Sequence, residues 1–388
     1  MLRPRFLASV LVASAVLSVI ARPSPGATLR VGPDKSYKTV HAAAEAAQTG
    51  DLVLIDAGVY AADVARWKAD NVTVRAVGGR AHLRADGAQA GGKGTWIVSG
   101  KNFTAEGIEF SGAAVPDKNG AGIRSETEGT LVLRGCYFHD NEEGILGGAD
   151  SMLIESCVFD KNGASDGRTH NLYVWGRSFT IRDSYTHRAV IGHNIKTRAK
   201  NNYILYNRIS DEADGSASYE VDVPDCGRTY LIGNVIEQGP LSENGGIVAY
   251  GAESGDNAPF LYAVNNTFVN NRRQGGTFLQ LRDGTKGLVR NNIFYGPGTV
   301  RSGGDVAEDH NYVEPAAANA ARFLAPGAYD FHLTGRSPRS IVDAAAPPGG
   351  APSGFDLTPT REYVHPAKSR PRPAAGALDV GAFELEKK

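Results

Sequence analysis

The chain has 388 residues, and its 41 Lys and Arg residues are balanced by 42 Asp and Glu residues. A net charge of −1 excludes a global electrostatic field that would attract nucleic acid or an anionic membrane. Glycine is abundant, with 47 residues, which suits many tight bends between short strands. The length is sufficient for one elongated domain or two compact ones.

The N-terminus has the pattern of a secretory leader. Arg3 and Arg5 precede an uncharged apolar run, 6–21, that is short for a membrane span of about 20 residues. We therefore expect residues 1–26 to be a cleaved signal peptide and the mature protein to be exported to the periplasm or beyond, without further membrane contact. A membrane anchor is the alternative.

The segment after the leader predicts a short amphipathic helix over Val40–Gln48. Gly50 ends it, and a continuous apolar strand, Leu52–Ile55, follows. Such a helix would cover the open N-terminal end of a stack of strands, where an unpaired edge would otherwise template aggregation.

An internal repeat is the strongest signal in the chain. Its copies alternate apolar and polar residues, turn through a small or polar residue, and resume with an apolar one: Leu131–Asn141, Met152–Asn162, Phe179–Ala189, Asn202–Glu212, Thr229–Gly239, Leu261–Asn271 and Gly287–Gly296. A constant motif with variable spacing indicates a fixed strand–bend–strand unit and loops of changeable length. We predict an all-β fold, a right-handed parallel β-helix with a short N-terminal capping helix.

The turn position of this repeat predicts an internal ladder. It is occupied in order by Cys136, Cys157, Ser184, Asn207, Asn234, Asn266 and Asn292. Equivalent residues of successive coils stack about 4.8 Å apart, so each asparagine amide can bond to the next. The two cysteines fall in the same buried column, and we expect them to be stacked free thiols rather than a disulfide.

The repeat is lost after Tyr312, where Pro and Ala become frequent. We assign 27–310 to the β-helix and 311–388 to C-terminal coils and a closing extension packed on it. Within the extension, Tyr329–Leu333 and Asp379–Glu384 are predicted to be late strands and a closing flap.

The capping helix, the Gly50–Ile55 strand and the terminal Asp379–Glu384 segment resemble those of the pectin-lyase-like superfamily of exported β-helix proteins. The resemblance covers nearly the whole mature chain and implies the fold. It does not imply one activity, because the superfamily includes lyases, hydrolases, esterases, epimerases and adhesins.

A second set of strands predicts the functional surface. Aligning the strands that begin at His170, His193 and Ser218 and applying the period of two puts their chemically active side chains on one outer face of neighbouring coils. These outward residues are Tyr173, Trp175, Asn194, Lys196, Arg198, Glu220 and Asp222, with Gln280 and Arg282 extending the face two coils further.

A groove along this face suits a linear polysaccharide, because successive coils offer a row of equivalent subsites. Tyr173, Trp175 and Tyr250 would stack on sugar faces. Cations at Lys196, Arg198 and Arg282 would bind acidic groups, which favours a uronic-acid-containing polymer. Asn194, Gln280 and His187, the last from a connecting loop, would add polar contacts.

Two chemistries fit these residues. In β-elimination, Lys196 would be the base and Arg198 would hold the uronate carboxylate, and His193 or Tyr173 would protonate the leaving oxygen, with His170 stacked on His193. The Lys and Arg resemble those of the chondroitin and alginate lyase group. Ca²⁺, if used, would be held by Glu220, Asp222 and Asn194.

In inverting hydrolysis, Glu220 and Asp222 would instead be the acid and base, since two residues along a strand span a suitable distance. A third reading is a non-catalytic polysaccharide-binding β-helix or adhesin. In each case we expect a monomer that binds no nucleic acid.

Overall fold

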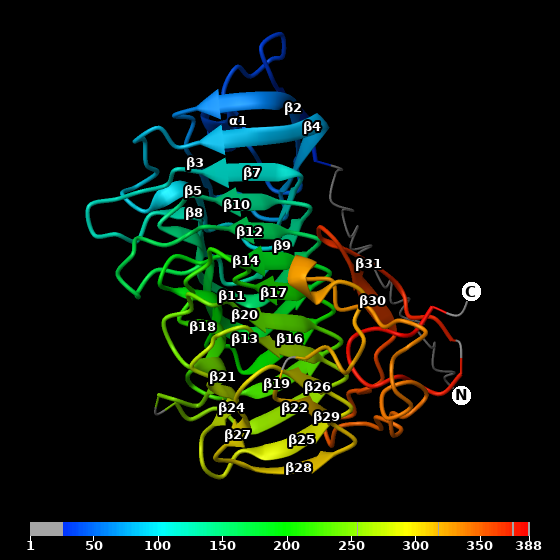
Figure 1. The fold of residues 1–388 in the computed structure, drawn as a ribbon. Helices are drawn as coiled ribbons and strands as arrows, with labels where there is room; N and C mark the ends of the chain where they lie inside the picture. Colours follow the sequence, from blue (N-terminus) through cyan, green and yellow to red (C-terminus); the bar gives the residue numbers. More distant parts are fainter. Residues whose placement is uncertain (1–25, 254, 317, 375, 387–388) are drawn as a thin grey trace, which may run out of the picture.

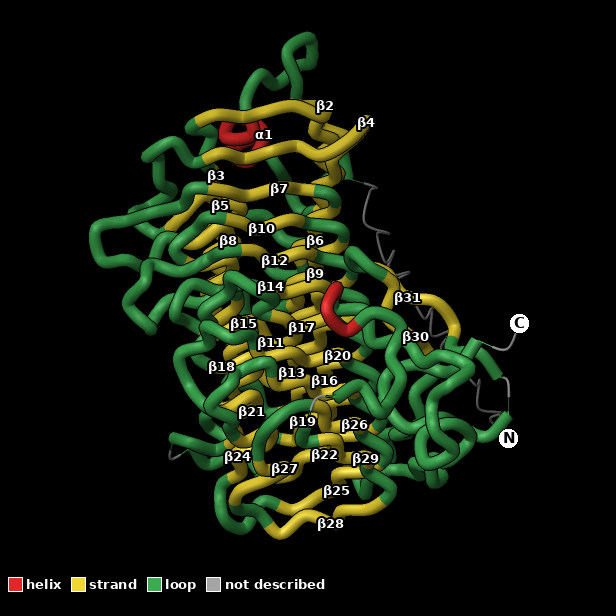
Figure 2. Tube along the Cα trace, viewed as in Figure 1, coloured by secondary structure: helices red, strands yellow, loops and turns green. Residues whose placement is uncertain are grey.

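The computed structural model describes residues 26–253, 255–316, 318–374 and 376–386. In it the chain winds as a parallel β-helix, with strands stacked in layers along one long axis (Figure 1). Figure 2 shows these strands in yellow, with the loops in green at the corners and along one side. The predicted all-β, parallel architecture is confirmed. The predicted leader, 1–26, lies outside the described residues except for its last position.

Three faces make up each coil, and each is named here for its outward side chains. The lysine face, which contains Lys196, is formed by β3 (Ala65–Trp67), β5 (Gly94–Val98), β8 (Ala121–Glu126), β15 (His193–Thr197), β18 (Tyr219–Val223), β21 (Gly246–Tyr250), β24 (Thr277–Leu281) and β27 (Thr299–Ser302). The tyrosine face, with the stack Tyr203–Tyr230–Tyr262, is formed by β1 (Thr28–Val31), β6 (Phe103–Glu106), β9 (Thr130–Arg134), β16 (Asn201–Leu205), β19 (Arg228–Ile232), β22 (Phe260–Val264), β25 (Lys286–Arg290) and β28 (Asp305–Asp309).

The histidine face, which includes His82, His139 and His187, completes the coil. It is formed by β7 (Ile108–Ser111), β10 (Tyr137–His139), β12 (Val158–Asp160), β14 (Tyr185–His187), β17 (Arg208–Ser210), β20 (Val235–Gln238), β23 (Thr267–Asn270), β26 (Ile293–Tyr295) and β29 (Tyr312–Glu314). Four long strands turn a corner: β2 (Leu52–Ala61) and β4 (Thr73–Arg84) run from the tyrosine to the histidine face, and β11 (Glu143–Glu155) and β13 (Leu172–Arg182) from the lysine to the tyrosine face.

The predicted capping helix is confirmed as α1 (Val40–Ala46), which packs against β1, β2 and β3 at the first coil. Thr39 caps its start, and the Asp63 carboxylate accepts from the backbone N–H groups of Val40 and His41 at 2.6 and 2.9 Å. The helix buries its apolar side over the core end, where it covers the coil edge. Within the described residues, no helix is long and apolar enough to span a membrane.

The C-terminal extension lies along the β-helix and covers parts of two faces (orange to red in Figure 1). Its buried Phe331, Leu333, Val380 and Phe383 form a second core against the histidine face, and Phe355 packs on the tyrosine stack. Among the described residues, the two apolar clusters that the extension forms with the coils contain no residue of the lysine-face strands.

The prediction of late strands in the extension is wrong. Residues 329–333 and 379–384 are irregular segments that insert apolar side chains into the second core. The extension's strands are instead β30 (Arg361–Val364) and β31 (Lys368–Pro371), which pair as an antiparallel hairpin. The apolar residues of these segments correctly indicated that their side chains are buried. Buried side chains do not require a strand, so the prediction of strands did not follow.

The predicted internal ladder is confirmed and runs one coil further than expected. Asn234 donates from Nδ2 to the Ile204 carbonyl at 2.8 Å and to Asn266 Oδ1 at 3.0 Å, while its own Oδ1 accepts from Asn207. The same pattern continues through Asn292 to Asn311. Cys157 joins the column by donating its backbone N–H to Ser184 Oγ. The cysteines Cys136, Cys157 and Cys226 are buried free thiols.

We predict that Asn234→Ala destabilises the protein by about 3 kcal/mol, because it removes the amide's bonds and leaves buried partners unpaired. Chemical denaturation measures this. Asn201→Ala is the matched control, because Asn201 makes a single bond at an exposed carbonyl and its loss costs below about 0.5 kcal/mol. Equal effects of the two substitutions would contradict a stabilising ladder.

Candidate active site on the lysine face

The start of each strand on the lysine face determines which side chains reach the surface. At this point two consecutive residues both point inward. The first is a corner residue, and the second begins the regular alternation of inward and outward side chains. The fully buried pairs are Asn171–Leu172, Asn194–Ile195, Glu220–Val221, Ile247–Val248 and Phe278–Leu279. The alternation of inward and outward side chains therefore begins only after the corner residue. A prediction that counts the corner residue as part of the alternation assigns side chains to the wrong side of the strand.

Beyond the corner, the outward residues of successive coils align in one column. Strand register puts Leu146, Tyr173, Lys196, Asp222, Ala249 and Gln280 in this column. A second column contains Gly148 and Trp175, and Trp175 is 39% exposed. A Cβ atom on Gly148 would lie 2.3 Å from Trp175 Nε1, so the glycine makes room for the indole. A hollow lined by Arg124, Glu126, Gly148 and Trp175 continues the surface toward earlier coils.

Lys196 is the centre of a compact charged cluster. Its Nζ lies 3.2 Å from Asp222 Oδ2 and 3.6 Å from Glu253 Oε1. On the side of the preceding coil, the ammonium lies 5.3 Å from the ring centroid of Tyr173. The Lys196 side chain is only 12% exposed, so carboxylates and an aromatic face replace most of its water.

Every nitrogen of the Arg198 guanidinium is engaged. Nε donates to the Tyr173 hydroxyl at 2.8 Å, one terminal nitrogen donates to Asp225 at 2.5 Å, and the other donates to Glu253 at 2.6 Å. Glu253 thus lies between the two cations, hydrogen-bonded to Arg198 and ion-paired with Lys196, although half of its own side chain is exposed. These partners hold the Arg198 planar group in one orientation.

His170 and His193 form a stacked pair beside this cluster. Their ring centroids are 4.5 Å apart, and His170 Nδ1 accepts from the His193 backbone N–H at 3.0 Å. Burial lowers the pKa of His193 to about 3, with a smaller contribution from Lys196, and lowers that of His170 well below its ordinary value. Both imidazoles are therefore neutral at physiological pH.

Asp222 connects the pair to the lysine. Its Oδ2 lies 3.4 Å from His193 Nε2 and 3.2 Å from Lys196 Nζ. Burial raises its pKa to about 6, although Lys196 opposes the shift. Asp222 is therefore a carboxyl that can gain and lose a proton near neutral pH.

The predicted outward positions of Asn194 and Glu220 are wrong, because both are inward corner residues. Asn194 Nδ2 donates to Glu220 Oε2 at 2.7 Å, and its Oδ1 accepts from Asn171 at 2.7 Å. Asp211 and Glu237 lie near Glu220 in the same interior polar column. Burial, reinforced by these two carboxyls, raises the pKa of Glu220 well above its ordinary value. Glu220 and Asp222 consequently lie on opposite sides of β18.

Two predicted substrate-binding residues also lie elsewhere. Tyr250 is an inward residue of the core, and its hydroxyl donates to the Gly227 carbonyl at 2.6 Å. His187 belongs to β14 on the histidine face, where it stacks on Tyr185 and lies 3.6 Å from Asp160. Gln280 and Arg282 lie at the lysine face two coils beyond Asp222, and Arg282 donates to the Gly255 carbonyl.

Asp225 and Glu253 are site residues that the sequence analysis missed. They follow the ends of β18 and β21, and the strand-end residues Val223 and Tyr250 are paired in register. Extending the strand alignment into the next loop residues would have placed both carboxylates beside Arg198.

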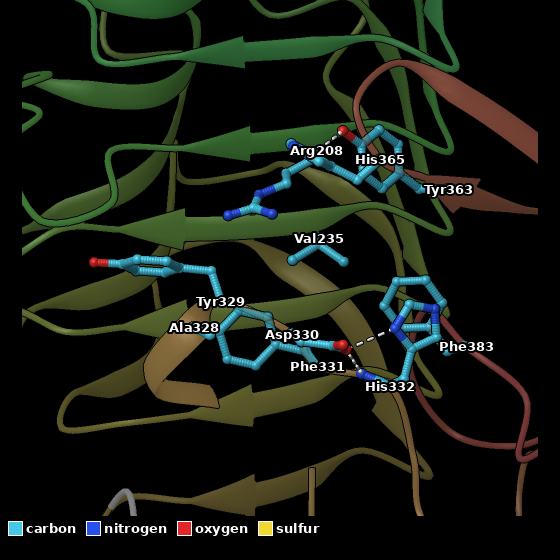
Figure 3. A pocket seen from close by; sticks show the side chains of 10 residues that line it. All are labelled: Arg208, Val235, Ala328, Tyr329, Asp330, Phe331, His332, Tyr363, His365 and Phe383. Atoms are coloured by element: carbon cyan, nitrogen blue, oxygen red, sulfur yellow. Dashed lines mark hydrogen bonds and ion pairs between the residues drawn. The ribbon is translucent and has the colours of Figure 1, made fainter. Parts of the chain in front are cut away.

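A separate pocket lies on the histidine face, beneath the C-terminal extension (Figure 3). Figure 3 shows Arg208 and Val235 from the coils facing Tyr329, Phe331, His332 and His365 of the extension. Asp330 accepts from His332, whose ring stacks on Phe383. This pocket contains none of the charged side chains around Lys196, and we assign it to the packing of the extension.

The sequence model of the family described as "Right handed beta helix region" matches residues 57–313. The chain therefore belongs to the right-handed β-helix family, and its fold is the pectin-lyase-like one. No curated protein sequence matches the chain.

Among solved structures, the chain is similar to the pectate lyase Pel9A, at 14% identity and a TM-score of 0.58, over 94% of this chain and 97% of that one. Matches with lower scores include the GH136 lacto-N-biosidase from Eubacterium ramulus, at 11% identity and a TM-score of 0.42 over 74% and 68% of the chains. The PL6 alginate lyase AlyGC matches at 16% identity and a TM-score of 0.36 over 78% and 41%. The pectate lyase similarity supports the fold alone.

Asp211, in the interior polar column beside Glu220, makes the free energy of unfolding depend on pH. Burial raises the pKa of Asp211 to about 7, against about 4 in an unfolded chain. Unfolding then releases a proton between these values, so this residue's stabilising contribution is lost as pH rises from about 4 to 7. We predict that the stability of Asp211→Asn relative to wild type increases over this range, as measured by denaturation at stepped pH. The exposed Asp256→Asn is the control, and parallel pH profiles for Asp211→Asn and wild type would contradict the assignment.

Proposed function

We propose that this protein is an exported polysaccharide lyase that cleaves a uronic-acid-containing polymer by β-elimination on the lysine face. The observation that supports this most directly is the position of the Glu253 carboxylate, which lies between Lys196 and Arg198. The two cations form a binding site for a carboxylate group. Glu253 is a half-exposed loop residue, so a uronate carboxylate can replace it at a small cost.

The bound uronate would have its carboxylate on Arg198 and its C5–H directed at Lys196. Neutralising the carboxylate acidifies the C5 proton, because negative charge develops on the carboxylate during its removal. Lys196 can act as the base after its ammonium gives a proton to Asp222 Oδ2, which lies 3.2 Å away and belongs to a carboxyl whose pKa is raised to about 6. The resulting amine takes the C5 proton, the C5–H electron pair forms the C4=C5 double bond, and the C4–O bond breaks.

Tyr173 is the better candidate to protonate the leaving oxygen. Its hydroxyl accepts from Arg198 Nε at 2.8 Å and its ring lies next to the Lys196 ammonium, whereas His193 is buried and neutral. A neutral imidazole is a weak acid, so His193 and His170 are better suited to holding Asp222 and Tyr173 in place. Trp175, exposed next to the hollow, offers a flat surface for the neighbouring sugar.

Calcium does not fit the ligand set predicted for it. Glu220 and Asn194 bond to each other in the interior, while Asp222 faces outward to Lys196. These three residues cannot surround one ion, and we derive no step through calcium. Added Ca²⁺ is expected to leave the reaction rate unchanged.

The alternative reactions are less well supported. Inverting hydrolysis by Glu220 and Asp222 requires both on one face, and they lie on opposite sides of β18. A protein that only binds polymer would not require a buried Lys–Asp–His chain beside its cationic site. The similarity in fold to a pectate lyase is compatible with the proposal, which rests on the lysine-face side chains.

We predict that the wild-type protein produces 4,5-unsaturated uronate ends from at least one polymer in a panel of pectate, alginate and glycosaminoglycans, seen as a rise in ultraviolet absorbance. Lys196→Ala should lower this rate by at least about 100-fold, because the base is removed. Lys200→Ala, an exposed lysine at the end of the same coil segment, should retain it. New reducing ends without unsaturation would indicate hydrolysis, and no cleavage of a broad panel would indicate binding alone.

We predict that Glu253→Gln lowers the KM for the polymer about 3- to 10-fold, because the neutral amide competes less well for Lys196 and Arg198. Steady-state kinetics at several salt concentrations measure this, with Glu308→Gln, an ion-paired glutamate far along the chain, as the control. An increase in KM would show that Glu253 binds substrate rather than occupying its place.

A further inference from the structure

A cluster of metal-ligand side chains lies on the histidine face, separate from the lysine face. It consists of His82 on β4, Glu109 on β7 and His139 on β10, which come from three successive coils. Glu109 is paired with His82 in strand register, and His139 lies one coil beyond and two residues along. The three side chains are about one-fifth exposed, so they are accessible to an ion while most of their surface is held by neighbours.

The two distances from the histidine nitrogens to Glu109 match those of a tetrahedral zinc site. His82 Nδ1 and His139 Nε2 lie 3.4 and 3.2 Å from the same oxygen, Glu109 Oε1. Two ligands bonded to one zinc at 2.0–2.1 Å in tetrahedral geometry are separated by about 3.3 Å. All the candidate ligand atoms lie within 4.8 Å of one another, so the two imidazoles and the carboxylate can face one ion.

The far nitrogen of each ring has an oxygen partner, which orients the ring. His82 Nε2 lies 2.7 Å from Ser111 Oγ, and His139 Nδ1 lies 2.6 Å from Asp140 Oδ2. With the ring protons on these nitrogens, the two nitrogens that face Glu109 present lone pairs, which is the tautomer that binds a metal. A carboxylate behind a liganding histidine is a common feature of zinc sites.

We propose that His82, Glu109 and His139 bind one Zn²⁺ ion, with Asp140 and Ser111 positioning the two imidazoles. Two imidazoles and one carboxylate suit zinc better than calcium or magnesium, which prefer a full set of oxygen ligands. Three protein ligands leave the fourth position to a solvent molecule, because Asp140 and Ser111 are occupied by the far ring nitrogens. The bound ion would link three successive coils, and this proposal does not depend on the proposed lyase activity.

The test is titration of the untagged full chain with Zn²⁺ and, separately, with Co²⁺ as a spectroscopic probe. We expect one Zn²⁺ per chain by calorimetry, a higher unfolding temperature in its presence, and the intense visible absorption of four-coordinate Co²⁺. His139→Ala and Glu109→Gln should each remove stoichiometric binding. His310→Ala should not, because His310 pairs with Asp309 on the tyrosine face, away from the cluster.

Asp140→Asn separates a positioning role from a structural one. It should weaken Zn²⁺ affinity about 10- to 100-fold while leaving the stoichiometry and the metal-free unfolding temperature unchanged. Because these side chains project from the outer surface, each variant is expected to fold, and Glu109→Gln keeps the shape of the original. Absence of a stoichiometric Zn²⁺ or Co²⁺ complex, or binding that survives both His139→Ala and Glu109→Gln, would overturn the proposal.

Discussion

The hydrogen-bonded stacking of one coil on the next, in register, is the constraint on which the rest of the molecule depends. It aligns equivalent residues into columns, so each column has one environment from end to end. The asparagine column inside the bend satisfies its own amides and the adjacent backbone at every step from Asn207 to Asn311. The same register brings Tyr173, Lys196 and Asp222 side by side on three coils, although these residues are far apart in the sequence.

Much of this order could be predicted from the sequence because it is periodic. The repeat specified the parallel coil, the ladder residues and the capping helix, and the period of two correctly put Lys196, Arg198, Tyr173, Trp175 and Asp222 outside. These are positions where local pattern and global fold agree. The candidate site could therefore be assigned to one face and three coils from the sequence.

The errors at Asn194, Glu220 and Tyr250 share a physical cause, which is the corner at the start of each lysine-face strand. Asn194 and Glu220 precede the regular alternation, and the bend turns them inward against the apparent period. Polar residues at buried corners are tolerated because they bond to each other, as Asn194 and Glu220 do. Tyr250 is inward because the alternation restarts after the corner. Glu253 and Asp225 lie in loops, whose path the repeat does not specify.

The division of the surface among three faces follows from the same stacking. The C-terminal extension covers parts of the tyrosine and histidine faces, and its described residues form no apolar cluster with the lysine-face strands. An open row of coils suits a polymer, while the cations between Tyr173 and Glu253 define one point on that row where charge is concentrated. Under the proposed function, binding along the row and chemistry at this point would be separate properties of one face.

Cleavage in water labelled with oxygen-18, followed by mass spectrometry of the products, tests the central claim most directly. Elimination breaks the C4–O bond without adding water, so the account predicts that one product of each pair carries a double bond and lacks the mass of water, and that products of short reactions, before the reducing ends exchange oxygen with the solvent, are unlabelled. Saturated products that carry the label at the new chain ends would show hydrolysis and contradict the account.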